Sequence, residues 1–326
     1  MREVTASAPG KVNLTLYAGA PTPDGYHPLV SIFEALHVRE TVTVRTSRSP
    51  GIRVTTTAYG LDGSIDQDAT ERMSRLNPVN HLAVRAAKSL QRLAMAGPWA
   101  STAAGLTIEV EKHVPIAGGM AGGSADAAAT LLACNELWGL GLGGDQLETL
   151  ARTLGADVPA CLVGGIAVGT GRGDHMTPVA TEGLTHYWAL ALADGGLATP
   201  DVFRALDGAG GPAGGWKTLE EPDVDDLAAL LRTPEDLAGF LHNDLTDAAL
   251  RLRPELSQTF TIGREAGALA VILSGSGPTI AALARDENHA QELAIAMAGS
   301  PAVARTLVTS GPAPGARIER SEGDPQ

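Results

Sequence analysis

The chain has 326 residues, and its 24 lysines and arginines against 37 aspartates and glutamates give a formal net charge of −13 at pH 7. This acidic balance argues against a protein that holds a nucleic-acid backbone by bulk electrostatic attraction. Hydrophobic residues make up 44% of the chain and charged residues only 19%, which excludes disorder throughout and allows a sizeable core. The length favours two domains.

The two cysteines, Cys134 and Cys161, are too few for a disulfide framework and show no C-x-x-C spacing for zinc or redox chemistry. We interpret them as small core residues of a protein in a reducing compartment. Residues 1–17 lack the basic start and the unbroken apolar stretch of a signal peptide, and no window of about 18 residues is free of polar breaks. We therefore expect a cytoplasmic protein, a monomer or a weak homodimer, without nucleic-acid or membrane partners.

β-Branched residues and period-2 alternation predict strands in the first sixty residues, at 11–17, 28–36 and 39–46, with a turn-rich stretch at 21–27. The polar, acidic segment 59–78 is expected to be a loop. Apolar residues at helical spacing then predict a helix over 80–95.

A strand at 105–111, a glycine-rich loop at 115–124 and a helix at 125–138 form the most informative stretch of the chain. Further helices are predicted at 145–154, 199–203, 224–232, 235–251 and 254–266, and a short one is predicted to start within 155–159. Further strands are predicted at 164–170, 187–193 and 268–273. The composition changes near 172–182, so we assign residues 1–175 and 176–310 to two domains. Residues 311–326 are rich in Gly, Pro and charge, and we expect a disordered tail there.

Four glycines in six positions, 118, 119, 122 and 123, leave a backbone with almost no Cβ atoms, so its N–H groups can approach an anion closely. Ser124 and the start of the next helix add a hydroxyl group and unpaired N–H donors at the positive end of the helix dipole. The alternative is a tight strand-to-helix turn without a ligand. We favour a phosphate cradle because so many glycines stand directly before a helix.

Neither common nucleotide-binding pattern fits the loop fully. The Rossmann pattern G-x-G-x-x-G fails because Met120 stands where a glycine is required. The P-loop spacing of Gly118 and Gly123 is followed by Ser124 instead of lysine. If the loop holds a triphosphate, positive charge must come from Mg²⁺ or from a lysine elsewhere. Asp126 would repel a bound phosphate, so we expect its carboxylate to point away from the ligand.

Residues 115–129 (PIAGGMAGGSADAAA) resemble the central signature of the GHMP kinases, a superfamily of small-molecule kinases. Three further segments, in the same order along the chain, resemble one family within it, the 4-diphosphocytidyl-2-C-methyl-D-erythritol kinases: residues 7–14 (SAPGKVNL), 24–27 (DGYH) and 154–159 (LGADVP). Residues 274–278 (SGSGP) resemble the third motif of the superfamily.

The resemblance implies an α+β protein with a two-domain GHMP kinase fold. The N-terminal α/β domain would be like the second domain of ribosomal protein S5, and the C-terminal α/β domain would be of the ferredoxin-like kind. The implied reaction is transfer of a phosphoryl group from ATP to the 2-hydroxyl group of 4-diphosphocytidyl-2-C-methyl-D-erythritol, in the non-mevalonate route to isoprenoid precursors. The site would lie in the cleft between the domains.

The resemblance assigns the catalytic chemistry to Lys11 and Asp157. Asp157 would accept the proton that an attacking hydroxyl group loses, and Lys11 would keep Asp157 ionised and supply the charge that the glycine loop lacks. Each residue has an ordinary alternative. Asp157 suits a helix N-cap, and Lys11 suits the solvated edge of a strand. On the catalytic interpretation, we expect the two side chains to converge.

The resemblance places the nucleotide on the glycine loop and beside Asn80, which is equally suited to cap the following helix. Mg²⁺ is expected for phosphoryl transfer, with Ser124 as its candidate ligand, and the sequence identifies no glutamate as a second ligand. The remaining nucleotide-binding residues that the resemblance implies are Pro115, Ala117, Gly118, Gly119, Met120, Ala121, Gly122, Gly123 and Ala125, together with Ser124 itself.

The resemblance also implies a set of substrate-binding residues, which comprises Asn13, Tyr26, His27, Phe203, Gly275 and Ser276. Among these, Tyr26 and Phe203 would clasp the cytosine ring, and His27 would form a hydrogen bond with its edge. The alternatives are a plain Asp-Gly turn at 24–27 and a core position for Phe203.

Two other functions fit parts of the sequence. Another kinase of the superfamily, such as a homoserine kinase, would share the glycine loop, but residues 24–27 together with Asp157 argue against it. A nucleotide-binding regulator without catalytic activity would keep the loop but has no need of Lys11 and Asp157 together. Replacing Asp157 by Asn separates the two, because a regulator would keep its ligand affinity whereas a kinase would lose turnover.

Overall fold

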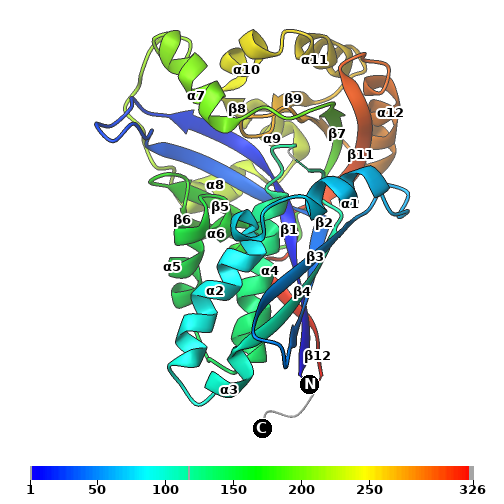
Figure 1. The fold of residues 1–326 in the computed structure, drawn as a ribbon. Helices are drawn as coiled ribbons and strands as arrows, with labels where there is room; N and C mark the ends of the chain where they lie inside the picture. The colour runs from blue at the N-terminus through cyan, green and yellow to red at the C-terminus, as the bar shows by residue number, and fades with distance from the viewer. Residues whose placement is uncertain (1, 117, 323–326) are drawn as a thin grey trace.

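The computed structural model describes residues 2–116 and 118–322, and it shows two lobes, one above the other in Figure 1. The lower lobe is built on an eight-stranded sheet with the central order β12-β1-β2-β4-β3, to which β5 and β6 are added beside β2, and β8 beside β1. The strands of this sheet are β1 (Glu3–Ala18), β2 (Leu29–Thr46), β3 (Gly51–Ala58), β4 (Gly105–Lys112), β5 (Ile166–Thr170), β6 (His175–Val179), β8 (His242–Asn243) and β12 (Arg317–Glu322).

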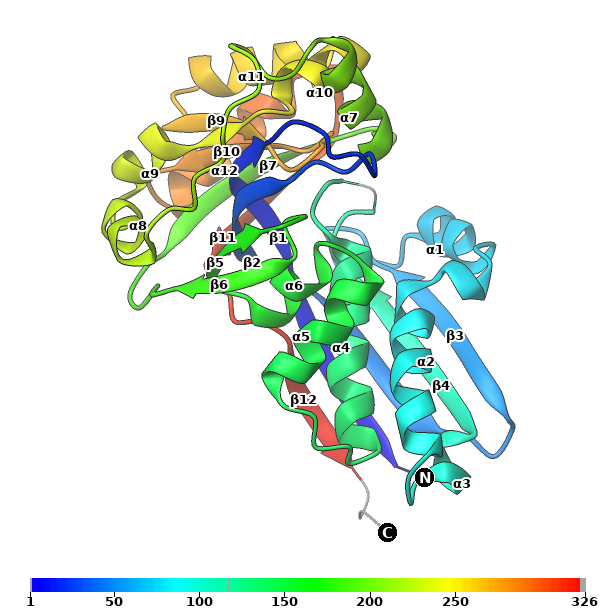
Figure 2. The same cartoon turned by 90° about the vertical axis from the view of Figure 1, so that its left-hand side faces the viewer.

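One face of this sheet is apolar because its strands alternate. In β4, Leu106, Ile108 and Val110 are buried, whereas Glu109 and Glu111 are exposed to solvent. Figure 2 shows helices α2, α4 and α5 beside one another along the sheet, and α4 packs against both β1 and β2. The helices of this lobe are α1 (Gln67–Ser74), η1 (Pro78–Asn80), α2 (Leu82–Met95), α3 (Ala100–Ala103), α4 (Gly122–Leu137), α5 (Gly144–Leu154) and α6 (Val158–Val163).

The upper lobe is built on a four-stranded antiparallel sheet, β11-β7-β10-β9. Numbered along the chain, its strands lie in the order 4-1-3-2 with helices between the first and second and between the third and fourth, which is the expected ferredoxin-like arrangement. Its elements are β7 (His186–Ala193), α7 (Thr199–Gly208), α8 (Val224–Leu230), α9 (Pro234–Phe240), α10 (Thr246–Leu252), α11 (Leu256–Glu265), β9 (Ala270–Leu273), β10 (Ile280–Ala284), α12 (Glu287–Met297) and β11 (Val303–Gly311). Across the described residues, none of the helices is long and apolar enough to cross a membrane.

The two lobes share a buried core. Trp188 and Leu283 of the upper sheet pack against Ile32 of β2 and Ile166 of β5. The ribbon formed by β1 and β2 runs from the lower sheet into the upper lobe (Figures 1 and 2). Because this contact is close-packed and apolar, it fixes how the two lobes face each other across the cleft.

The final segment differs from the disordered tail that the composition suggested. Strand β12 pairs antiparallel with β1, from Arg317 opposite Ser7 to Glu322 opposite Glu3. The prediction is wrong because an exposed edge strand carries the same polar composition as a disordered segment, and only the long-range pairing with β1 distinguishes them. Residues 323–326 lie outside the described part of the chain.

Other differences are local. The predicted strands 28–36 and 39–46 form the single strand β2. Segment 59–78, expected to be a loop, contains α1, which begins at a side-chain N-cap. Segment 235–251 contains α9, β8 and α10 instead of one helix, because the backbone of Leu241 is extended. Strand β6 pairs with β5, so the lower sheet continues past the expected boundary at residue 175.

Candidate active site

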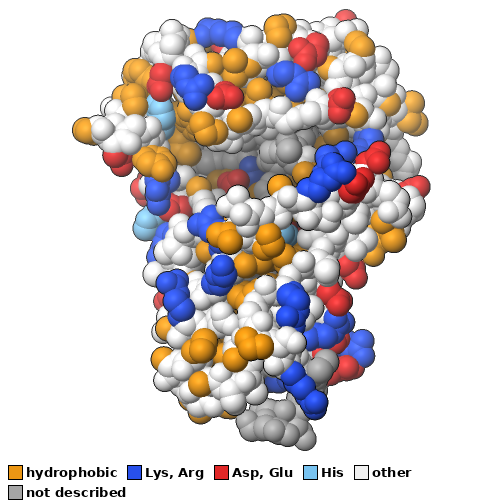
Figure 3. Space-filling view, in the orientation of Figure 1, with side chains coloured by type: hydrophobic (Ala, Val, Ile, Leu, Met, Phe, Trp, Pro, Cys, Tyr) orange, Lys and Arg blue, Asp and Glu red, His pale blue; other side chains and the backbone are white. Residues whose placement is uncertain are grey.

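A cavity of about 850 Å³ lies between the lobes, and Figure 3 shows the surface hollowed there. Its walls come from β1, β2, the glycine loop and residues 152–157 in the lower lobe, and from α7 and residues 275–276 in the upper lobe. Segments far apart in the sequence therefore meet in it. The expected site residues that line this cavity are Lys11, Asn13, Tyr26, His27, Gly119, Ala121, Asp157, Phe203, Gly275 and Ser276.

Lys11 lies on β1 at this cavity and is only 4% exposed. Its Nζ donates a hydrogen bond to Asn13 Oδ1 at 2.6 Å and lies 3.9 Å from Asp157 Oδ2. Lys11 is therefore not a solvated edge lysine. The distance to Asp157 is longer than a hydrogen bond, and an ammonium group has three donors, so Nζ can still donate to another group.

Asp157 stands at the N-cap position of α6, but its side chain makes no capping hydrogen bond. The side chain is 40% exposed and faces the cavity beside Lys11. The capping alternative that the sequence allowed is therefore not realised. The carboxylate keeps acceptor capacity for a group that enters the cavity.

Asn13 links Lys11 to the interior of the ribbon. Its Nδ2 donates to Ser31 Oγ at 2.8 Å, and Ser31 Oγ donates in turn to the carbonyl oxygen of Thr15 at 2.6 Å. Because the amide nitrogen is committed to Ser31, the amide oxygen must face Lys11. This buried chain of hydrogen bonds holds Lys11 in one orientation.

The glycine loop is tied to β1 and to the upper lobe. The N–H of Lys11 donates to Met120 O at 3.1 Å. Gly119 has φ +74°, and a Cβ atom there would lie 2.6 Å from Ser274 O, so only glycine fits. Ala121 has φ +62°, the one positive φ of a residue other than glycine in the described ranges. This strained position lies directly before α4, where the loop backbone joins the start of the helix.

Helix α4 starts at Gly122, and the first helical hydrogen bond runs from the N–H of Ala125 to Ala121 O. The N–H groups of Gly122, Gly123 and Ser124 therefore precede the helical ladder, at the positive end of the helix dipole. Ser124 is partly exposed and adds a hydroxyl group. These donors fit phosphate oxygens.

The described residues contain no group of three or more His, Cys, Asp or Glu side chains that could hold a metal ion. A Mg²⁺ ion at the glycine loop would rest on the Ser124 hydroxyl group, phosphate oxygens and water, a ligand set that Mg²⁺ accepts.

Asp126 belongs to a buried cluster behind the loop. Lys112 Nζ lies 2.8 Å from Asp126 Oδ2 and 2.8 Å from Glu40 Oε1, and the N–H of His113 donates to Glu40 Oε2. Burial raises the pKa of Glu40 to about 8 against the opposing effect of Lys112. Burial alone would lower the pKa of Lys112, but Asp126 and Glu40 raise it instead. The cluster anchors β2, β4 and α4 to one another under the loop.

A second cavity of about 420 Å³ meets the first at the glycine loop, because Gly118 lines this one and Gly119 the other. It is also lined by Pro115 and by the rings of Tyr59 and His113, which stack with centroids 4.7 Å apart. An aromatic wall beside a loop whose N–H donors fit phosphate oxygens suits a nucleotide.

At the far end of the larger cavity, His27 is buried in an aromatic cluster. Its ring stacks on Phe203 with centroids 4.9 Å apart and lies 5.3 Å from the Trp216 ring. Its Nδ1 is 2.8 Å from Gly19 O, and its Nε2 is 3.3 Å from Asp207 Oδ1. Tyr26 is 55% exposed and lines the cavity.

The closing motif, residues 274–278, connects the lobes at Lys11. Gly275 has φ +58°, and a Cβ atom there would lie 3.1 Å from Lys11 Nζ. The hydroxyl groups of Ser276 and Thr199 are hydrogen-bonded at 2.8 Å. Asn243 Nδ2 donates to Leu273 O and to Gly275 O, which fixes the bend of the motif.

Six of the expected nucleotide-binding residues line neither cavity: Asn80, Met120, Gly122, Gly123, Ser124 and Ala125. Asn80 is exposed and is the last residue of η1. The cap of α2 is His81, whose Nδ1 accepts from the N–H of Ala83, so the capping alternative for Asn80 is wrong. Ala117 lies outside the described residues.

The structure adds three cationic residues that sequence reasoning missed. Arg152, Arg172 and Arg204 line the larger cavity. The Arg172 guanidinium carbon lies 5.2 Å from the centre of the Tyr26 ring. The available signal was the position of Arg172 between Gly171 and Gly173, both with positive φ, which form a tight turn that presents a side chain.

The family model described as GHMP kinases N terminal domain matches residues 81–165, and the model described as GHMP kinases C terminal matches residues 218–300. A relative from Cutibacterium acnes named 4-diphosphocytidyl-2-C-methyl-D-erythritol kinase is 43% identical over 316 residues, which cover 97% of this chain and 96% of the relative. A relative of the same name from Paenarthrobacter aurescens is 45% identical over 320 residues, with 97% and 96% covered.

Among solved structures, a 4-(cytidine 5'-diphospho)-2C-methyl-D-erythritol kinase is similar with a TM-score of 0.69 and 30% identity, covering 94% of this chain and 98% of that one. A homoserine kinase from Cytophaga hutchinsonii has a TM-score of 0.67 at 18% identity, with 97% of each chain covered, and this likeness concerns the fold alone.

The two lobes and the glycine loop before α4 define the fold as that of a GHMP kinase, as the sequence motifs implied. Within that superfamily, the chain belongs to the family of 4-diphosphocytidyl-2-C-methyl-D-erythritol kinases. It is therefore an ATP-dependent phosphotransferase with an alcohol group as acceptor, and these relatives favour that function over a homoserine kinase or a regulator without activity.

Proposed function

We propose that the chain transfers the γ-phosphoryl group of ATP to the 2-hydroxyl group of 4-diphosphocytidyl-2-C-methyl-D-erythritol. The observation that carries this proposal is the pair of Lys11 and Asp157, 3.9 Å apart at a cavity that also reaches the glycine loop and the aromatic cluster at His27. The names of relatives 43% and 45% identical over nearly the whole chain support this substrate.

In the proposed reaction, the oxygen of the 2-hydroxyl group forms a bond to the γ-phosphorus, and Asp157 accepts the proton that this hydroxyl group loses. The bond between the γ-phosphorus and the oxygen that links it to the β-phosphate breaks, which releases ADP. Lys11 stabilises the negative charge on the attacking oxygen and on the transferred group with the donors that Asn13 leaves unused. The N–H groups at the start of α4 hold the phosphate oxygens in line.

Mg²⁺, held by Ser124 and the phosphates, would neutralise charge between the β- and γ-phosphates. At the other end of the cavity, Tyr26 and Phe203 would stack on the cytosine ring, with His27 at its edge. Arg152 and Arg172 would offset the charge of the substrate diphosphate, which the net charge of −13 would otherwise repel.

The test is incubation of the purified chain with ATP, Mg²⁺ and 4-diphosphocytidyl-2-C-methyl-D-erythritol, followed by phosphorus NMR of the product. We expect one new phosphomonoester signal that correlates with the substituents at C2. Homoserine and mevalonate serve as comparison acceptors. ADP release with either of them, and none with the cytidyl substrate, would refute the proposed substrate while leaving the fold unaffected.

A further inference from the structure

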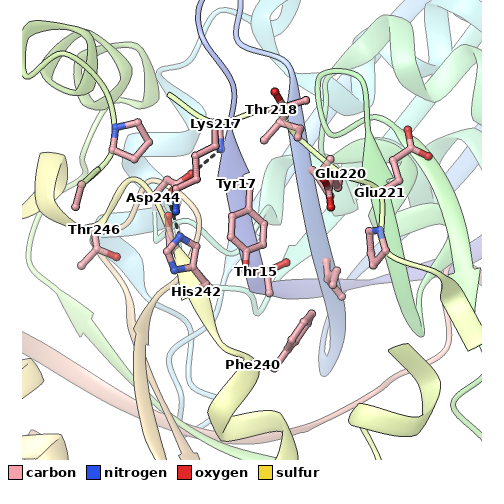
Figure 4. A pocket seen from close by; sticks show the side chains of 18 of the residues that line it. Thr15, Tyr17, Lys217, Thr218, Glu220, Glu221, Phe240, His242, Asp244 and Thr246 are labelled. Carbon is pink, nitrogen blue, oxygen red and sulfur yellow. Dashed lines mark hydrogen bonds and ion pairs between the residues drawn. The ribbon is translucent and has the colours of Figure 1, made fainter. Parts of the chain in front are cut away.

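Strand β1 has different partners along the edge that faces away from β2. Residues 3–7 pair with β12, the N–H of Lys11 donates to the glycine loop, and residues 15–16 pair with β8. Figure 4 shows the last of these regions, where Tyr17 and His242 lie beside a third cavity, of about 760 Å³. Within the described part of the chain, Lys11 therefore has no strand beside it on this edge, and contacts other than strand pairing hold it there.

The segment between β11 and β12, residues 312–316, contacts the ribbon close to Lys11, and we call it the strap. In Figure 2 the red C-terminal chain leaves β11 in the upper lobe and continues into β12 in the lower lobe. The N–H of Ala313 donates to Ala35 O at 2.8 Å, and Ala35 is the residue of β2 opposite Lys11. The carbonyl oxygen of Ala313 accepts from the N–H of Gly165, two residues after α6. The strap is therefore bonded to the ribbon and to the segment that follows α6.

The strap also holds the C-terminal end of α6, the helix of 6 residues that follows Asp157. A helix this short is not stable alone, and its last carbonyl groups have no helical partners. The N–H of Ala316 supplies a partner to one of them, Leu162 O, at 3.1 Å. A Cβ atom on Gly315 would lie 2.3 Å from Leu162 O and 2.4 Å from Val163 O, so only glycine fits there. This close contact blocks a shift of α6 towards the strap.

Arg39 of β2 connects the strap to β1. Its Nη1 donates to Pro314 O at 2.6 Å, and its Nη2 donates to Gly315 O at 2.7 Å. Its Nε donates to Ser7 Oγ at 2.9 Å, and Nη2 also donates to Ser7 O at 3.2 Å. Ser7 lies on β1, the strand that carries Lys11. One planar guanidinium group therefore bonds to both β1 and the strap, a geometry that the single ammonium group of a lysine does not reproduce.

We propose that Arg39 is a positioning residue for the phosphoryl transfer, because it acts through the strap on α6 and so holds Asp157 beside Lys11. The inference rests on the proposed function, which assigns the reaction to that pair. The two charged groups are 3.9 Å apart, and Asp157 makes no capping hydrogen bond that would fix it to its own helix. Neither Arg39 nor any strap residue lines the two cavities of the site, so the effect of Arg39 does not involve contact with ATP or the acceptor.

The chain contains its own probe of α6. Cys161 lies on α6 and Cys134 lies on α4; these are the only cysteines of the chain, and both are buried free thiols. In Arg39→Ala, α6 should separate from the strap more often. A thiol reagent such as 5,5'-dithiobis(2-nitrobenzoate) should then label Cys161 about tenfold faster than in the parent chain, and Cys134 within about twofold of the parent rate. A general loss of stability would accelerate both reactions alike. Mass spectrometry of the labelled peptides separates the two cysteines, and the measurement needs no substrate.

Arg39→Ala should also lower kcat about tenfold without changing the KM for ATP, because a misplaced base slows the reaction while the nucleotide contacts remain. Arg39→Lys keeps the charge but not the paired donors, so its kcat should fall between those of Arg39→Ala and the parent chain. Arg45→Ala is the matched control. Arg45 lies on the same strand, its partners are Glu3 and Glu109, and neither of these belongs to the strap or to α6. This control should change neither kcat nor the labelling of Cys161.

Gly315→Ala displaces α6 by a second route. It keeps Arg39 and places a methyl group against Leu162 O and Val163 O, so the end of α6 has to move away from the strap. This variant should reproduce both the lower kcat and the faster labelling of Cys161 without the loss of a charged group.

Three results would overturn the proposal: unchanged labelling of Cys161 in Arg39→Ala and Gly315→Ala, faster labelling of Cys161 with unchanged kcat, or equal acceleration at Cys134. The comparison with Asp157→Asn separates this inference from the proposed function. Loss of turnover in Asp157→Asn together with unchanged kcat in Arg39→Ala refutes the role of Arg39 alone. Full turnover in Asp157→Asn refutes the proposed function, whatever the labelling shows.

Discussion

Lys11 and Lys112 are both buried beside carboxylates in the lower lobe, yet their surroundings differ. Lys112 Nζ lies 2.8 Å from Glu40 and 2.8 Å from Asp126, and all three side chains are buried. Lys11 Nζ lies 3.9 Å from Asp157, whose side chain is 40% exposed. The first group is closed, and the second opens to a cavity.

This difference separates structure from chemistry. In the closed cluster the charges neutralise one another and hold β2, β4 and α4 together, so the loss of one member leaves a buried charge unpaired. In the open pair, the donors of Lys11 and the carboxylate of Asp157 retain capacity for a third group. The comparison therefore predicts that the Lys112 cluster controls stability and that the pair of Lys11 and Asp157 controls turnover.

The largest expected effect is that of Asp157→Asn. The amide keeps the shape of the side chain but cannot accept a proton, so turnover should fall by about 10²- to 10⁴-fold. ATP affinity and the urea midpoint should remain those of the parent chain. Steady-state kinetics measure turnover, calorimetric titration measures the affinity for ATP, and urea unfolding measures the midpoint. A loss of turnover below tenfold would show that the open pair is not the reacting one.

Lys112→Met should act on stability. Removing the central cation leaves Glu40 and Asp126 facing each other in the interior, at a cost of about 3–5 kcal/mol. The shift of the urea unfolding midpoint measures it. Lys88→Met, an exposed lysine on α2, is the matched control and should stay within about 0.5 kcal/mol. Similar midpoints for the two variants would contradict the role of the closed cluster.

Ser31→Ala should have a smaller effect on turnover. It removes the acceptor of the Asn13 amide and loosens the support of Lys11 without touching the charged groups. A loss of about 1 kcal/mol corresponds to roughly a fivefold fall in kcat. The variant should leave the KM for ATP unchanged. If KM rises and kcat does not fall, the hydrogen-bonded chain serves nucleotide binding and not the orientation of Lys11.

The last expected effect concerns pH. The pKa of Glu40 rises on folding from 4.5 to about 8, so its protonated form stabilises the fold fully below pH 4.5, and this contribution is lost as pH rises towards 8. Relative to Glu40→Gln, which has no proton to lose, the parent chain should therefore become steadily less stable between pH 5 and 8. Urea midpoints measured across that range test this, and parallel curves for the two proteins would refute it.

The sequence predicts the parts of the site that depend on local pattern. The glycines before α4 and the ferredoxin-like domain are found as expected, and Lys11 and Asp157 converge although 146 positions separate them by their numbers. The motifs, not the spacing, carried that last expectation. Their roles in catalysis stay predictions that the variants above test.

The missed features depend on distant partners. Asp126 could not be placed because its partner, Lys112, lies on another element. Lys112 is also paired with Glu40, which lies on a third element. Strands β10 and β11 and helix α12 were not predicted, since short apolar runs such as 280–284 favour no single element by periodicity. Arg172 enters the cavity only because β5 and β6 turn it towards Tyr26.

The pairing of β12 with β1 has a consequence for synthesis. A ribosome makes β1 first and β12 only after some three hundred further residues, so one side of β1 has exposed backbone N–H and C=O groups throughout translation. The nascent lower lobe thus cannot complete its own sheet, and during that interval its open strand is available to neighbouring chains or to a chaperone.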